Sequence, residues 1–196
     1  MALEALGSDH IDELLAAASD RTTFAFTNVP ADQYAMQTYV SNLLEDHRAG
    51  RALPFVQRAV GLDRRPIVGC TRFMDVRYQF ARRVDGEIVP DEVEIGGTWL
   101  SSLVQRTGVN TEAKLLLLRH AFGEWGVQRV AICTDERNEQ SRRAIERIGA
   151  RFEGVLRRHR PSTAVGEAGR LRNTAAYSVT IDDWPAVESR LVGLLR

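Results

Sequence analysis

The most informative part of the sequence is Trp99-Leu-Ser-Ser-Leu-Val-Gln-Arg-Thr-Gly-Val-Asn-Thr-Glu-Ala-Lys114, in which a short strand runs through a polar turn into an amphipathic helix. Gly108 lets the backbone of the turn approach a ligand, and either Asn110 or Thr111 is a suitable N-cap. The first amides of a helix have no partner within it, and the helix dipole adds partial positive charge there. The stretch predicts an anion site at this helix start, with an ordinary strand-to-helix connection as the alternative.

Two familiar nucleotide-binding loops do not fit this stretch. The phosphate loop of nucleoside triphosphatases needs a second glycine followed by Lys and Ser or Thr, and the turn lacks both features. The dinucleotide fingerprint needs several glycines, whereas Gln105 to Thr111 contains only Gly108. We therefore expect the anion to belong to something other than a nucleoside triphosphate or NAD.

Composition limits the class of protein. A chain of 196 residues with 44% hydrophobic and 27% charged residues is typical of one globular domain, here residues 1–196. Basic and acidic residues balance at 26 each, which disfavours nucleic acid or an anionic membrane as a partner. The sequence has neither an apolar run of roughly 20 residues nor a signal-peptide pattern, so we expect a cytoplasmic protein. Lys114 is the only lysine, a bias typical of a G/C-rich bacterium.

Hydrophobic periodicity predicts a mixed sheet flanked by helices, an α/β or α+β fold. Apolar residues at helical spacing predict helices around Ile11–Ala18, Met36–Leu44, Ala113–Trp125, Glu139–Ile148 and Trp184–Leu194. Strands are predicted at Leu53–Val60, Ile67–Arg77, Glu92–Leu100, Arg129–Thr134, Phe152–His159 and Asn173–Ile181. The strand at Arg129 returns through a crossover helix, so it should run parallel to the strand at Glu92. Cys70 and Cys133 lie in apolar strands and are expected to be reduced core thiols.

A second group of polar residues follows the strand at Arg129. Within Asn138–Gly149, helical spacing places Ser141 on the same face as Ile145 and Ile148, so its hydroxyl should point inward. An inward serine beside a cleft is a candidate proton donor. The alternative is that Ser141 bonds a backbone carbonyl while Asn138 only caps the helix.

The two motifs together resemble the GNAT N-acyltransferase superfamily. Gln105-Arg-Thr-Gly-Val-Asn110 resembles its acyl-CoA pyrophosphate loop, and Asn138 to Gly149 resembles the motif that follows. The spacing of Asn138, Ser141 and Gly149 is similar to the branch that contains the Rim-type ribosomal-protein alanine N-acetyltransferases. The resemblance covers roughly Ile67 to Ile181.

The resemblance implies a largely antiparallel sheet with a splayed parallel strand pair that holds acetyl-CoA as cosubstrate. Pantetheine would pair with the strand near Trp99 to Ser101, pyrophosphate would meet the amides of Arg106 to Thr111, and Asn138 would contact the pantetheine arm. The implied cofactor-binding residues are Trp99, Leu100, Ser101, Gln105, Arg106, Thr107, Gly108, Val109, Asn110, Thr111, Asn138 and Ser141. Two positions depart from the family pattern: Asn110 replaces a second Gly or Ala, and Ile145 replaces a Tyr acid, which leaves Ser141 as its substitute.

Acyl transfer to an amine needs a neutral nucleophile, a polarised carbonyl and a stabilised leaving thiolate. On the strand Glu92–Leu100, alternation places Val93, Ile95 and Trp99 on one face and Glu94 on the other. Glu94 is the candidate base and Ser141 the candidate acid, with a solvated or Arg-paired carboxylate as the alternative for Glu94. Lys114 could neutralise phosphate charge or simply be solvated. No metal is required, because the four His residues are scattered.

The sequence predicts an acetyl-CoA-dependent N-acetyltransferase that acts by direct attack in a ternary complex. The acceptor is an amine, either a protein amino terminus or a small amine, amino sugar or polyamine. A noncatalytic acyl-CoA-binding or sensing module is the alternative, and a nucleic-acid-associated protein is a weaker one because the net charge is zero. The basic run Arg157–Arg160 could bind an acidic substrate or be a solvated strand end, and a homodimer is left open.

Overall fold

The computed structural model describes residues 1–196. Its centre is a seven-stranded sheet. The strand order is β1-β2-β3-β6-β7-β9-β8, and every neighbouring pair is antiparallel except β6 and β7. The strands are β1 (Ala2–Ala5), β2 (Ala52–Arg58), β3 (Ile67–Arg77), β6 (Glu92–Leu100), β7 (Arg129–Asp135), β8 (Arg151–Pro161) and β9 (Leu171–Thr180). The predicted fold class, a largely antiparallel sheet with one parallel pair, is confirmed.

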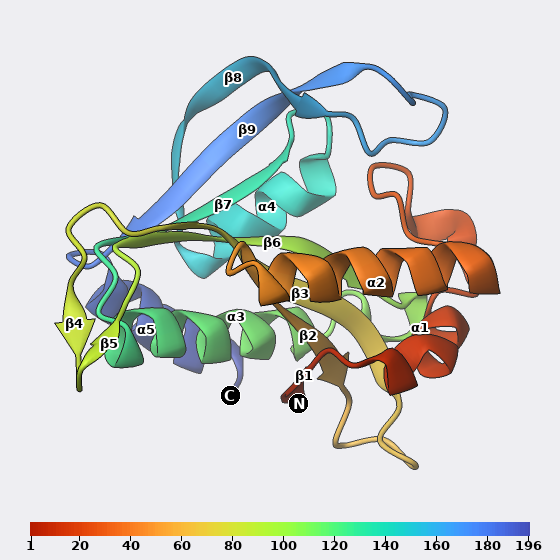
Figure 1. Cartoon of the computed structure of the whole chain (residues 1–196), viewed down its shortest axis with the longest axis horizontal. Coiled ribbons are helices and arrows are strands. Elements are labelled where there is room, and N and C mark those ends of the chain that lie inside the picture. Colours follow the sequence, from red (N-terminus) through yellow and green to blue (C-terminus); the bar gives the residue numbers. More distant parts are fainter.

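Helices cover both faces of the sheet (Figure 1). One face carries α1 (Ile11–Ala17) and α2 (Gln33–Arg48), and the other carries α3 (Val109–Arg119), α4 (Glu139–Ile148) and α5 (Trp184–Leu194). The α3 helix continues as a wider π turn over His120–Glu124. A short hairpin, β4 (Arg83–Val84) and β5 (Glu87–Ile88), projects from the end of β3, and the pattern analysis had predicted neither it nor β1. No helix is both long and apolar enough to cross a bilayer.

Two hydrophobic cores lie on opposite faces of the sheet. The larger one joins α3, α4 and α5 to β6, β7 and β9, with Phe122, Ile148, Tyr177 and Leu191 among its members. The smaller one joins α1 and α2 to β2 and β3. The last helix packs on α3 and α4 within this chain. The side chain of Asp183, its N-cap residue, makes no capping hydrogen bond and accepts instead from the hydroxyl of Thr180 at 2.8 Å.

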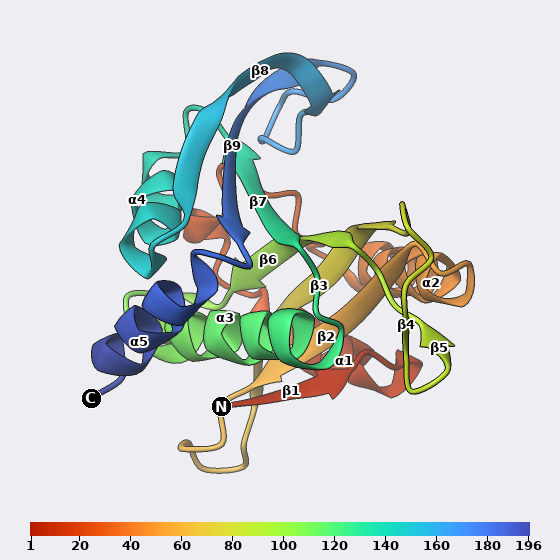
Figure 2. The ribbon, with the colours of Figure 1, turned by 90° about the vertical axis from the view of Figure 1, so that its left-hand side faces the viewer.

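The parallel contact between β6 and β7 is short. Only Glu92 to Glu94 pair with Arg129 to Ala131, after which β6 continues along β3 and β7 continues along β9. Figure 2 shows β7, β9 and β8 turning away from the rest of the sheet beyond this contact. The expected splay is therefore present, and it opens a gap in the middle of the sheet.

A bulge in β6 corrects the predicted alternation of side chains. Cys70 pairs with Trp99 while Arg72 pairs with Gly96, so β6 carries one extra residue at this point, and Gly97 adopts a φ of 58°. Val93 and Ile95 accordingly join the core beneath α3, whereas the Trp99 side chain joins the core beneath α1 and α2. Strict alternation predicts that Val93, Ile95 and Trp99 share one face, because it does not allow for the extra residue of a bulge.

Gly149 ends α4 in the left-handed conformation, with a φ of 102°, and a Cβ there would lie 3.2 Å from Val187 Cγ2. We expect Gly149→Ala to lower the free energy of unfolding by about 1–2 kcal/mol, measured by urea titration. Gly193→Ala is the matched control: it lies in α5 with open space around it, and should raise stability by about 0.5 kcal/mol. Equal effects at the two glycines would contradict this account.

Candidate active site

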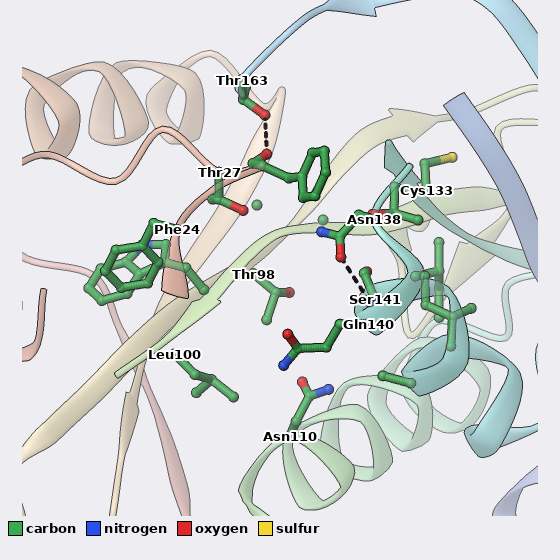
Figure 3. A pocket seen from close by; sticks show the side chains of 18 of the residues that line it. Phe24, Thr27, Thr98, Leu100, Asn110, Cys133, Asn138, Gln140, Ser141 and Thr163 are labelled. Carbon is green, nitrogen blue, oxygen red and sulfur yellow. Dashed lines mark hydrogen bonds between the residues drawn. The ribbon is translucent and has the colours of Figure 1, made fainter. Parts of the chain in front are cut away.

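A cleft of about 1280 Å³ occupies the gap between β6 and β7. Its walls come from β6, β7, the turn before α3, the start of α4, the segment between α1 and α2, and the loop between β8 and β9 (Figure 3). Beyond Glu94 the edge of β6 that faces β7 has no strand partner, so its peptide groups face the cleft. The splay thus creates a slot in which an extended molecule could add to the free edge of β6.

The turn before α3 presents a run of free amides at one end of the cleft. The amides of Arg106, Thr107, Gly108, Asn110 and Thr111 donate to no group of the chain. Thr107 Oγ1 accepts from the amide of Val109 at 3.3 Å, so the side chain that supports the helix start is Thr107 rather than Asn110 or Thr111. A row of unpaired amides at a helix N-terminus is suited to bind an anion.

Gly108 has a different local role from the expected one. Its φ of −69° is open to any residue, and a Cβ there would meet only Leu195 Cδ2, at 3.3 Å, so the conformation does not require glycine. The left-handed residue of the turn is Arg106, with a φ of 61°. The Asn110 side chain faces the cleft, and its buried Oδ1 has no partner (Figure 3).

The start of α4 forms the opposite wall. Asn138 caps the helix, because its Oδ1 accepts from the amide of Ser141 at 3.0 Å. The Ser141 side chain lines the cleft and its hydroxyl makes no hydrogen bond within the protein, which removes the alternative that it bonds a backbone carbonyl (Figure 3). Arg143 and Arg147 also border the cleft, where Arg143 pairs with Glu139 at 3.0 Å and Arg147 donates to Thr111 Oγ1 at 3.2 Å. The wall therefore offers one free hydroxyl and two cations.

The predicted pantetheine strand contributes its backbone more than its side chains. The Trp99 indole faces α2 and donates from Nε1 to the Tyr39 hydroxyl at 3.3 Å. The Leu100 carbonyl accepts from Gln105 Nε2 at 3.0 Å, and the Ser101 hydroxyl accepts from the amide of Leu103. Among the predicted cofactor-binding residues, those that lie outside the cleft wall are Ser101, Gly108, Val109 and Thr111.

Lys114 is buried beneath the cleft, which corrects the expectation of a solvated lysine. Its side chain points from α3 towards β6, and Nζ donates to Thr98 Oγ1 at 3.0 Å. Only 4% of the residue is exposed, and no carboxylate pairs with it. Burial lowers the pKa of Lys114 to about 8, so part of the population is neutral near physiological pH.

Glu94 lies at the apex of the gap on the face of α1 and α2. Both of its oxygens accept from the Arg160 guanidinium, at 2.8 and 2.7 Å, and Arg160 also contacts Asp75 at 2.6 Å. The Arg-paired alternative is therefore the arrangement observed. The pairing leaves Glu94 in the cleft wall but occupies its oxygens, so proton transfer to it requires Arg160 to shift or a water to relay.

Two loops meet above the cleft. Thr163 Oγ1 in the β8–β9 loop donates to the Phe26 carbonyl at 2.8 Å (Figure 3). The amide of Val165 donates to the Ala25 carbonyl at 3.1 Å. The Arg137 guanidinium lies over the Phe26 ring and is held by Asp135 and Glu167. These contacts join the two arms of the splayed sheet, so the cleft is roofed.

The cysteines are free, but only Cys70 is a core residue. Cys133 lines the cleft, and burial together with the nearby Glu94 raises the pKa of its thiol to about 12. A thiol that stays protonated is a poor nucleophile.

Several cleft residues were missed by reasoning from the sequence. Arg160 belongs to the basic run Arg157–Arg160, and strand alternation could have turned it inward. Arg72, Arg172 and Tyr39 carry no local signal, because they reach the cleft through strand register and helix packing.

Comparison with known proteins places this geometry in a family. The model of the family described as "Acetyltransferase (GNAT) domain" matches residues 1–151, which is more than half of the chain. The chain belongs to the GNAT acetyltransferase family. The predicted family and the acyltransferase class are thereby confirmed.

Individual relatives agree with this assignment. A GCN5-related N-acetyltransferase from Brucella melitensis superposes with a TM-score of 0.78 at 28% identity, covering 99% of this chain and 81% of that one. RimJ of Mycobacterium smegmatis, solved in complex with a CoA-disulfide, shares the fold with a TM-score of 0.74 at 22% identity, over 97% of this chain and 87% of its own. YdaF of Bacillus subtilis (strain 168), provisionally named a ribosomal N-acetyltransferase, is 41% identical over 61 residues, which span 31% of this chain and 33% of YdaF.

The buried amine of Lys114 predicts a pH-dependent change in stability. Below pH 8 the amine is charged in both the folded and the unfolded state, and burying that charge lowers the free energy of unfolding. Between pH 8 and 10.5 the amine is neutral in the folded state but still charged in the unfolded state, so this destabilisation decreases as the pH rises. We expect Lys114→Met to raise the free energy of unfolding by about 2 kcal/mol near pH 7, and by less at about pH 9.5. Urea titrations at the two pH values measure this, and a pH-independent gain would contradict the buried charge.

Proposed function

We propose that this protein transfers the acetyl group of acetyl-CoA to a primary amine by direct attack within a ternary complex. The observation that carries the proposal is the cleft at the β6–β7 splay, with free amides at one end and Glu94 at its apex. The amine nitrogen bonds to the thioester carbonyl carbon and the C–S bond breaks. The nitrogen loses a proton and the sulfur gains one, so the products are an amide and free CoA thiol.

The residues of the cleft divide into groups that serve this reaction. The free amides of the turn before α3 would hold pyrophosphate, with Arg143 and Arg147 of α4 adding positive charge. The unpaired edge of β6 would bond the pantetheine amides, and a peptide amide of that edge would polarise the thioester carbonyl. These groups fit an elongated ligand with an anionic end and an amide-containing arm, which is the chemistry of acyl-CoA.

Ser141 is the proposed acid, because its free hydroxyl faces the cleft from the wall opposite β6. Glu94 is the proposed base, acting directly or through a water that Arg160 helps to position. The amine must be neutral to attack, so a proton acceptor at the apex of the gap is needed. The cytoplasmic location, the single domain and any homodimer stay predictions.

Acetyl-CoA binding with no transfer would favour the alternative of a noncatalytic acyl-CoA-binding module. Titration calorimetry measures the binding, and thiol release with a panel of amines and peptides measures the transfer. Binding without any release of CoA would overturn the proposed enzyme, and no binding would overturn both functions.

Replacement of Ser141 should separate chemistry from binding. Ser141→Ala is expected to lower kcat about 100-fold, because the thiolate then leaves without a proton donor, while the Kd for acetyl-CoA stays within about twofold. Ser189→Ala is the matched control, since that hydroxyl lies on α5 and bonds the Pro185 carbonyl at 2.9 Å. A normal kcat for Ser141→Ala would remove this serine from the mechanism.

Replacement of Glu94 tests the base. Glu94→Gln retains an oxygen that can accept from Arg160 but cannot take up a proton, so we expect kcat to fall about 100-fold and the acidic limb of its pH profile to change. Glu87→Gln is the control, because Glu87 is exposed on β5 and lies outside the cleft wall. An unchanged rate and pH profile for Glu94→Gln would discard Glu94 as the base.

A further inference from the structure

Two arginines in the cleft wall have no partner in the protein. Arg72 on β3 and Arg172 on β9 are partly buried, and neither guanidinium donates a hydrogen bond or lies within 4 Å of a carboxylate. The Nε of Arg172 is buried without any acceptor. Burial lowers the pKa of Arg172, and the nearby carboxylates of Asp135 and Glu94, which are hydrogen-bonded to other arginines, offset only part of that effect.

Neighbouring arginines on this side of the cleft are paired. Arg160 holds both oxygens of Glu94 and one oxygen of Asp75, and Arg137 holds Asp135 and Glu167. The carboxylates that could neutralise Arg72 and Arg172 are therefore already used. Two positive charges are left over in a partly desolvated wall, where a guanidinium is normally matched by an anion.

Strand alternation places both free arginines on the face of α1 and α2. Phe73 joins the core beneath α3, so its neighbour Arg72 points to the opposite face. On β9, Ala175 and Tyr177 join that same core, so Arg172, an odd number of residues away, also points to the face of α1 and α2. The arginines lie across the sheet from the free amides of the turn before α3.

The two sets of anion-binding groups therefore lie on different faces of the sheet. The amides before α3, together with Arg143 and Arg147, suit the pyrophosphate end of the acyl donor. Arg72 and Arg172 lie on the side where Glu94 faces, which is the side that the proposed reaction leaves to the amine. An acyl donor that passes through the gap between β6 and β7 would bring its neutral acyl end near Arg72 and Arg172. That end carries no negative charge that the two guanidinium groups could bind.

We infer that the acceptor amine carries an oxyanion, a carboxylate or a phosphate, and that Arg72 and Arg172 bind it. This inference rests on the proposed function and narrows its substrate class. An anionic acceptor supplies the hydrogen-bond acceptors that both guanidinium groups lack, and the forked geometry of arginine suits either oxyanion. Cationic polyamines are correspondingly excluded by repulsion from the same wall.

Matched acceptor pairs test the inference with the full-length protein and acetyl-CoA. Thiol release is measured for peptide amides that differ only by Glu or Gln after the first residue, for a free amino acid and its amide, and for phosphoethanolamine and ethanolamine. We expect at least one anionic member to exceed its neutral partner about tenfold or more in kcat/KM, and the advantage to shrink as salt increases. The three pairs distinguish a peptide side chain, an α-carboxylate and a phosphate as the source of the charge.

Variants assign the effect to the two arginines. Arg72→Gln and Arg172→Gln should each raise KM for the anionic acceptor about tenfold, while kcat/KM for its neutral partner and the Kd for acetyl-CoA stay within about twofold. Arg48→Gln on α2 is the control, because Arg48 is exposed and lies outside the cleft. Unchanged acetyl-CoA binding verifies that each variant is folded.

The outcomes separate this inference from the proposed function. Equal rates for anionic and neutral acceptors, or an anionic preference that survives both substitutions, would overturn the inference while leaving the transferase in place. If acetyl-CoA binds and no amine of any charge is acetylated, the proposed function fails and the inference fails with it.

Discussion

The parallel contact between β6 and β7 lasts for three residue pairs, and the position of the cleft follows from its brevity. At this contact Arg129 pairs with Glu92 on β6 and with Glu153 on β8, so ion pairs clamp the strands together where they meet. Beyond it, β6 is held by β3 and β7 is held by β9, and the two halves of the sheet diverge. A gap in the middle of a sheet would normally be filled by side chains, but here the free strand edge and the helix starts face into it.

The bulge at Gly97 and the splay act together. The splay opens a passage through the sheet, and the bulge shifts the side chains of β6 so that the Trp99 indole leaves the passage and packs beneath α2. The two faces of the sheet then present different chemistry, with free amides beside α3 on one and the paired Glu94 and Arg160 on the other. In the proposed reaction, donor and acceptor would approach from opposite sides and meet at the passage, which the contact between Thr163 and Phe26 covers.

Local patterns predicted the parts of this molecule that local physics determines. The bounds of β6 and α4 and the left-handed stop at Gly149 follow from apolar periodicity and from a glycine at the right place. The motifs around Gly108 and Asn138 indicated the turn and the helix start that border the cleft, because the start of a helix has a recognisable residue pattern. Patterns failed where tertiary register decides: the bulge at Gly97 changed the side of Trp99, and Arg160 reached Glu94 from a strand 66 residues away. The burial of Lys114 was missed for the same reason, because the local sequence pattern does not reveal which side of α3 packs against the sheet.

The position of the single lysine has a consequence for the outer surface of the protein. All other basic side chains that stay charged at neutral pH are guanidinium groups, which are not nucleophilic, and Lys114 lies beneath the cleft. The only other primary amine of this sequence is that of Met1, which pairs with Glu112 at 2.7 Å. A reagent directed at side-chain amines would therefore report on the interior of the cleft rather than on the exterior of the protein.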